Sequence, residues 1–149
     1  MTLSERLTLT LTLDTSIYAS GDVLADTQEL QDALRRRDAK GILRTLTVID
    51  KDDQGAAMDV YFFSRNVSLG TENSTPSLTD ANFEYYLGHI SVESADYKDL
   101  GGAQVACIKN ENIELQSSDA SRNVYVAVVT RGTPTHTASG IVLGFGILW

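Results

Sequence analysis

The amino-acid sequence predicts an all-β protein, an antiparallel β-sandwich of jelly-roll type with one or two short helices in its connections. Short runs rich in β-branched and aromatic residues recur along the chain, separated by Gly, Asn, Asp, Ser and Pro. Leu7–Leu13 alternates strictly between leucine and threonine, the two-residue period of a half-buried strand. Asn123–Thr130 is almost continuously apolar, as in a strand covered on both faces. A small closed barrel is the alternative architecture.

Length and charge limit the class of protein. A chain of 149 residues can bury a core of its own, so we expect one domain over residues 1–149, with residues 1–14 as an extended arm or strand. The formal net charge of −8 repels phosphate groups, so we expect neither nucleic acid nor membrane as a partner. Met1–Asp14 lacks a basic start followed by an apolar run, and we expect synthesis in the cytoplasm without export.

The first third of the chain contains two predicted strands and one ambiguous segment. Leu7–Leu13 can pair within its own domain or reach a neighbouring subunit. Val23–Thr27 is a short strand after a turn. Glu29–Lys40 is rich in helix formers and predicts a helix, with a polar loop as the alternative. Its basic run Arg35–Arg37 is either solvated or an ion-pair contact to an acidic partner.

The centre of the fold is predicted at two apolar runs, Ile42–Ile49 and Met58–Phe63. An acidic, Gly-containing break separates them, which predicts an antiparallel hairpin at the centre of one sheet. The break begins like a calcium loop, with oxygen-bearing side chains at Asp50, Asp52 and Gln54 and a turn at Gly55. Tyr61 stands where an EF-hand needs its bidentate Glu, so that motif fails. A solvated turn and a cation site of another kind remain.

A polar segment over residues 64–78 predicts a long surface loop suited to contacts with other proteins. Ser77 then caps a short predicted helix, Asp80–Leu87, that should turn Phe83, Tyr86 and Leu87 toward the core.

Strands return after this helix, for an expected total of about eight to ten. They are His89–Val92, Ala103–Ile108, Ile113–Gln116, Asn123–Thr130 and Ile141–Trp149. In the last strand Gly144 and Gly146 lie opposite the apolar face, where a missing side chain permits close approach by another group.

No residue pattern announces catalysis. His89 is predicted to be half-buried in a strand, and His136 to be solvated in the loop Gly132–Gly140. Cys107, the single cysteine, has apolar neighbours and is predicted to be a buried structural thiol. The sequence has no nucleophile elbow, phosphate loop or dinucleotide fingerprint. We therefore expect no enzyme, no cofactor and no metal ion.

Four stretches resemble a family of small proteins from tailed bacteriophages. They are YASGDVLADTQEL (Tyr18–Leu30), VIDKDDQGAAMDVYFFSRNVSLGTENSTPSLTDAN (Val48–Asn82), DYKDLGGAQVA (Asp96–Ala106) and GTPTHTASGIVLGFG (Gly132–Gly146). The most specific part is DDQGAAMDVYFFSRNVSLGTENS. The family is described mostly as hypothetical or virion proteins, and the resemblance brings no catalytic residues.

The resemblance implies a virion component made in the host cytoplasm. The role we expect is that of a capsid decoration, or cement, protein on the outer surface of the head. Its partners would be the major capsid protein and, in a homotrimer, itself. The alternatives are a tail, head–tail or fibre-associated module, for which glycan binding is one option, and an enzyme or carbohydrate-binding protein outside the virion. The candidate assembly contacts are Leu7, Leu9, Leu11, Asn66, Ser68, Leu69, Thr71 and Asn73.

Overall fold

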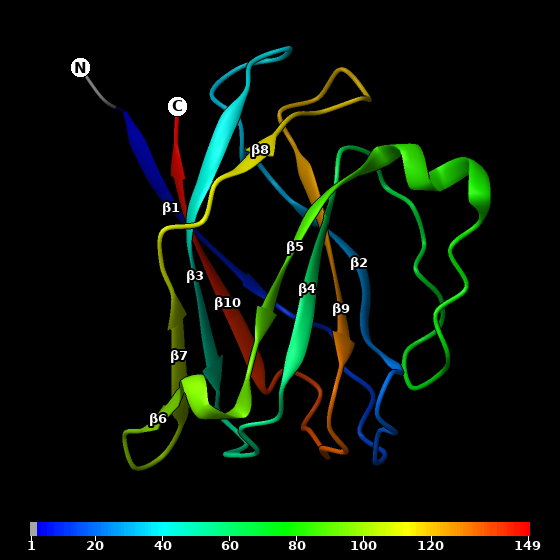
Figure 1. Ribbon diagram of the computed structural model, residues 1–149, viewed down its shortest axis with the longest axis vertical. Coiled ribbons are helices and arrows are strands. Elements are labelled where there is room, and N and C mark those ends of the chain that lie inside the picture. The colour runs from blue at the N-terminus through cyan, green and yellow to red at the C-terminus, as the bar shows by residue number, and fades with distance from the viewer. Residues whose placement is uncertain (1–2) are drawn as a thin grey trace.

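The computed structural model describes residues 3–149 and confirms the all-β prediction. Two antiparallel sheets pack face to face, and the two helices of the described residues are short 3-10 turns (Figure 1). The strands are β1 Ser4–Thr10, β2 Val23–Leu30, β3 Gly41–Asp50, β4 Met58–Phe63, β5 Tyr86–Val92, β6 Tyr97–Asp99, β7 Gln104–Ile108, β8 Ile113–Leu115, β9 Val124–Thr130 and β10 Ile141–Leu148; the 3-10 helices are η1 Asp80–Tyr85 and η2 Ser94–Asp96. No helix in residues 3–149 is long and apolar enough to cross a membrane.

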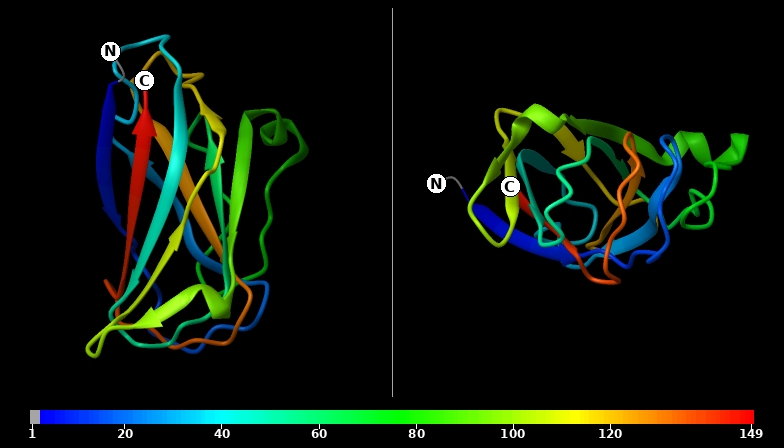
Figure 2. Two further views of the ribbon diagram at one scale, coloured as in Figure 1. Left: turned by 60° about the vertical axis from the view of Figure 1, so that its left-hand side comes forward. Right: turned by 90° about the horizontal axis from the view of Figure 1, so that it is seen from below.

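The larger sheet has six strands, in the order β1-β10-β3-β7-β6, and β8 pairs with β3 beside this path. Its strands β1, β10 and β3 lie side by side in the left view of Figure 2. The smaller sheet has four strands in the order β2-β9-β4-β5. The N-terminal strand β1 pairs with β10 along its whole length, from Ser4 opposite Leu148 to Thr10 opposite Val142. Of the two alternatives for this strand, pairing within its own domain is the one observed.

The predicted central hairpin is wrong in its pairing. β3 is central in the six-stranded sheet, between β10 and β7, whereas β4 is central in the four-stranded sheet, between β9 and β5. The loop 51–57 therefore carries the chain from one layer to the other. Each strand is apolar because it lies in the middle of a sheet, as the sequence indicated, but its partners are distant in sequence. The acidic turn residues order a connection between layers and not a hairpin.

The core lies between the two sheets. Phe62 of β4 and Phe145 of β10 pack edge to face, with ring centroids 6.0 Å apart, and both side chains are buried. Leu11 and Leu13, just beyond the end of β1, are also buried in this core. Burial of one such side chain contributes about 1.5–3 kcal/mol to stability. The inner faces of both sheets thus join strands that are far apart in sequence.

The side chain of Gln28 bridges the two sheets at one edge of the sandwich. The Gln28 amide of β2 donates to the Thr10 carbonyl at 3.1 Å and accepts from the Thr12 N–H at 2.8 Å. These two bonds to a side chain stand where backbone hydrogen bonds would otherwise join β2 to the end of β1. The architecture is therefore a sandwich whose edge is bridged by a side chain, and the barrel alternative is not observed.

The predicted helix at Glu29–Lys40 does not form. β2 continues to Leu30, and residues 31–40 form turns in which Asp32 and Asp38 adopt positive φ angles of 57° and 59°. Ala33 and Leu34 are buried as a helix face would be, but hydrogen bonds to residues distant in the sequence hold them in place. The Leu34 N–H donates to the Arg122 carbonyl at 2.9 Å, and the Trp149 indole donates to the Ala33 carbonyl at 3.0 Å. The run Arg35–Arg37 is exposed, in agreement with a solvated loop.

The predicted helix Asp80–Leu87 is a shorter 3-10 turn, η1, that ends at Tyr85. Thr79, not Ser77, stands at its N-terminus, and no side chain caps it. The expectation that Phe83 and Tyr86 face the core is wrong, because they are 56% and 42% exposed. A 3-10 helix of six residues is only about two turns long and here buries none of its residues, so Phe83 stays at the surface.

Candidate binding surface and the aspartate–histidine cluster

The polar segment 64–79 lies over the outer face of the four-stranded sheet. Val67 and Leu69 are buried there, in a second hydrophobic cluster with Phe63 of β4 and Val129 of β9. The Asp26 carboxylate of β2 holds the segment, because it accepts the Leu69 N–H at 2.7 Å and the Ser68 hydroxyl at 2.9 Å. This cover explains why every residue of β9 is buried.

An open cavity of about 360 Å³ remains between this segment, η1 and the sheet, and we name it the aromatic cleft. Its lining residues are Tyr61, Phe63, Leu69, Pro76, Ser77, Leu78, Phe83, Tyr86, Val129 and Arg131. Phe83 and Tyr86 are the most exposed aromatic rings at its edge. A concave, largely apolar site of this size is typical of binding sites.

The charged groups at the border of the aromatic cleft, Arg131 and Asp59, form an ion pair, so together they carry no net charge. Arg131 Nε donates to Asp59 Oδ2 at 2.6 Å, and Arg131 Nη2 donates to the Tyr61 hydroxyl at 3.4 Å. The hydrogen bond to Asp59 raises the pKa of the Arg131 guanidinium. The Tyr86 hydroxyl bonds to Nδ1 of His89, which is exposed and not half-buried as predicted. The cleft can thus contact an apolar group and bond to neutral polar groups at its border.

The candidate assembly contacts lie on two separate parts of the molecule. Near the N-terminus, Leu7 and Leu9 of β1 pack partly buried against the core, and Leu11, just beyond the end of β1, is 1% exposed. Of those in the segment 64–79, Leu69 is 6% exposed and faces the sheet, so neither it nor Leu11 is at the surface. Asn66, Ser68 and Thr71 are exposed, and Asn73 is half-buried. Their role in assembly stays a prediction.

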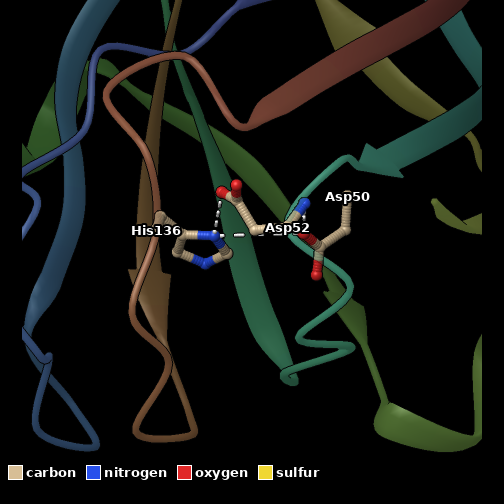
Figure 3. A group of neighbouring side chains, drawn as sticks. All are labelled: Asp50, Asp52 and His136. Atoms are coloured by element: carbon tan, nitrogen blue, oxygen red, sulfur yellow. Dashed lines mark hydrogen bonds and ion pairs between the residues drawn. The ribbon is translucent and has the colours of Figure 1, made fainter. Parts of the chain in front are cut away.

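Three side chains gather where the loop after β3 meets the loop before β10 (Figure 3). They are Asp50 at the end of β3, Asp52 from the first loop and His136 from the second, with ligand atoms within 4.8 Å of one another. His136 Nδ1 lies 3.1 Å from Asp52 Oδ2 and 3.9 Å from Asp50 Oδ1. The prediction that His136 is solvated is therefore wrong, because its side chain is 1% exposed.

Backbone N–H groups surround the carboxylate of Asp50. Its Oδ1 accepts the Asp52 N–H at 3.0 Å, and its Oδ2 accepts the N–H groups of Gln54 at 2.9 Å and Gly55 at 2.7 Å. These bonds satisfy a carboxylate that is 1% exposed, and they fold the residues resembling a calcium loop around it. Asp50 is thus the organising residue of the loop.

Asp52 reaches across to the other loop. Its Oδ2 accepts the Thr137 N–H and its Oδ1 accepts the Thr137 hydroxyl, both at 2.9 Å. Burial acts to raise the pKa of Asp52, but the hydrogen bonds from Thr137 and His136 outweigh it, and the pKa lies below its ordinary value. Since N–H and O–H donors already point at the carboxylate oxygens, the geometry fits a clasp between two loops better than a cation site.

No signal in the sequence pairs His136 with Asp52, because 84 residues separate them. Only the topology brings the two loops to the same end of the sandwich. The prediction for Cys107 is also wrong, because it is exposed on β7. Its neighbours in sequence point into the core by strand alternation, whereas Cys107 points outward.

Comparisons with known proteins give the following findings. No family model matches the chain, and no curated protein matches it. Among solved structures, one of Desmodium yellow mottle tymovirus is 10% identical, with a TM-score of 0.30 over 99% of this chain and 81% of that one. The native virion of Kashmir bee virus at acidic pH is 10% identical, with a TM-score of 0.26 over 100% of this chain and 70% of that one. The VP2 subviral particle of infectious bursal disease virus is 9% identical, with a TM-score of 0.25 over 99% and 40%. Scores this low carry no conclusion about this chain.

Proposed function

We propose that this chain is a virion structural protein of a tailed bacteriophage, a decoration protein that binds the outside of the head and stabilises contacts between major capsid subunits. The aromatic cleft carries the proposal. It offers an apolar surface with Phe83 and Tyr86 exposed, which is the composition of a protein-contact surface. Val48–Asn82, which includes the segment over the sheet, resembles small proteins of tailed bacteriophages, and this resemblance is the reason for proposing a phage virion.

Such a protein stabilises the capsid by shifting the equilibrium toward the state that it binds. A protein that binds only the assembled, expanded shell lowers the free energy of that state relative to the others. Many copies bound to one particle add their individually weak contacts, and a homotrimer would join its three contacts through avidity. Neither step needs a catalytic group.

A tail, head–tail or fibre-associated module that binds a glycan is the second candidate. One observation favours it: aromatic rings of the cleft stand beside the ion pair of Arg131 and Asp59. Rings can stack on the apolar face of a sugar while charged groups bond to its hydroxyls, and about 360 Å³ accommodates a small ligand.

Binding to purified phage heads tests the proposal. We expect wild-type protein to sediment with expanded heads and not with immature heads. Phe83→Ala should weaken this binding about tenfold, because aromatic side chains dominate protein interfaces. Leu100→Ala is the matched control, since Leu100 is 74% exposed on a turn outside the cleft. Binding to tails alone, or equal binding of wild type and Phe83→Ala, contradicts the proposal, and sedimentation of the free protein gives its oligomeric state.

A further inference from the structure

The outer face of the six-stranded sheet contains a second groove, of about 450 Å³, which we name the sheet groove. It lies on the sheet that does not carry the aromatic cleft. Its floor is uncharged and comes from neighbouring strands, with Thr47 and Ile49 from β3 and Val105 and Cys107 from β7. Basic side chains border it: Arg6 of β1, Lys98 of β6 and Lys109 just after β7.

Gly144 of β10, the strand between β1 and β3, leaves room for the Arg6 side chain to lie over the sheet. β10 separates β1 from β3, and Arg6 lies opposite Gly146 in the ladder, next to Gly144. A Cβ added at Gly144 would lie 2.8 Å from Arg6 Nη2 and 3.0 Å from Nη1. The bare backbone of β10 therefore lets the guanidinium cross it and donate to the Thr47 hydroxyl at 3.4 Å. The charge is held at the groove.

The groove is positively charged in an acidic protein. Arg6, Lys98 and Lys109 are exposed, and within residues 3–149 none of the three makes an ion pair. The one acidic residue of the lining, Asp96, is half-buried, and its Oδ2 accepts the Glu93 N–H at 2.8 Å. Three of the twelve Lys and Arg side chains thus gather at one groove, although the chain has a net charge of −8.

We propose that the sheet groove docks an acidic segment of a partner protein, with side-chain carboxylates on Arg6, Lys98 and Lys109. Charge complementarity identifies the occupant, because within residues 3–149 none of the three cations forms an ion pair. The uncharged floor suits an extended segment laid across the strands. Duplex DNA is the disfavoured polyanion, since the rest of the surface repels a long phosphate backbone. The inference rests on the proposed function in that the partner would be a capsid subunit.

Cys107 provides a direct test on phage heads, because the single thiol of the chain lines the groove. We expect maleimide labelling of Cys107 to slow about tenfold or more in the head-bound protein. The triple variant R6Q/K98Q/K109Q should bind heads about tenfold or more weakly, with a smaller salt dependence. R35Q/R36Q/R37Q is the matched control, since it removes the same charge from the exposed loop 31–40. Full labelling with equal binding of both variants overturns the docking site and leaves the proposed function intact.

A labelled Glu-octamer peptide tests the groove without phage particles. We expect wild type and R35Q/R36Q/R37Q to bind it, with affinity that falls as salt is added, and R6Q/K98Q/K109Q to bind at least about fivefold more weakly. No binding by wild type, equal weakening in both variants, or preference for a duplex DNA of equal charge overturns the inference. Absence of binding to heads together with peptide binding at the groove overturns the proposed function alone.

Discussion

His136 Nδ1 lies 3.1 Å from Asp52 Oδ2, and this contact joins the loop after β3 to the loop before β10. β3 and β10 are neighbours in the six-stranded sheet, but the loop after β3 continues to β4 in the other sheet. The clasp therefore fixes the end of the sandwich at which β3 passes to β4 and β9 passes to β10. The buried His136, the half-buried Asp52 and Thr137 share the contact, so removal of Asp52 leaves the donors of the other two without this acceptor.

Asp52→Ala should lower the free energy of unfolding by about 2–4 kcal/mol, because it removes the acceptor of three hydrogen bonds. Urea unfolding followed by tryptophan fluorescence at Trp149 measures it. Lys51→Ala is the control: its side chain is exposed, and it should change stability by less than about 0.5 kcal/mol. Equal stability of the two variants would show that the clasp contributes nothing.

Stability should fall as the solution becomes acidic. The pKa of Asp52 is lower in the folded protein than its ordinary value of 3.8, and the pKa of Asp119 is also lowered, since hydrogen bonds from Ser117, Ser121 and Tyr125 outweigh the effect of burial. A depressed pKa means that the carboxylate stabilises the fold above the unfolded value and loses this effect as pH falls through the folded value. Unfolding at pH 6 and pH 3 should show this loss, and the gap between wild type and Asp52→Asn should narrow at pH 3. A gap of constant size would contradict the assignment.

Gly144→Ala should destabilise the protein by about 1–3 kcal/mol, because the new Cβ would lie 2.3 Å from the Thr47 hydroxyl oxygen and 2.8 Å from Arg6 Nη2. Gly102→Ala is the matched control, since nothing lies within 4 Å of its Cβ position. Thermal unfolding of a double variant with Thr47→Ala should recover part of the loss. No recovery would mean that Arg6 alone, or the backbone of β10, carries the cost.

Sequence patterns predicted the elements whose signal is local. Strand alternation in Ile141–Trp149 requires no knowledge of the partner strand, and the structure confirms both its buried face and its glycine face. Pairing could not be predicted in this way. A short connection favours pairing of β3 with β4 in a hairpin, whereas the observed partner β10 begins about 90 residues beyond the end of β3.

Distant contacts also decided the remaining differences. Leu34 and Ala33 have helix-like spacing to Leu30, but hydrogen bonds to Arg122 and Trp149 hold them in a loop. Propensity of a short segment is a weak preference that tertiary contacts override. The spacing of Asp50 and Asp52 indicates a candidate site, whereas the sequence neighbours of His136 indicate only a solvated loop, which is why its burial in the clasp could not be predicted.

Phe62→Ala should destabilise the protein by about 3–5 kcal/mol, because the ring is buried between the sheets against Phe145. Phe83→Ala should cost less than about 0.5 kcal/mol, because Phe83 is 56% exposed. Urea unfolding of both variants measures the contrast. It also shows whether Phe83 is free to serve in binding, and a large loss in Phe83→Ala would assign the ring to the fold.

Cys107 should react rapidly with a thiol reagent in the native protein. The side chain is exposed on the outer face of β7, opposite Thr47 of β3, whereas its neighbour Ala106 is buried. Reaction with dithionitrobenzoate without denaturant should therefore release one equivalent of thiolate at a rate close to that of the unfolded chain. Ala106→Cys in a Cys107→Ser background gives the comparison, because a thiol at the buried position should react only as the protein unfolds. Similar rates at the two positions would contradict the strand register that places one side chain outward and the other in the core.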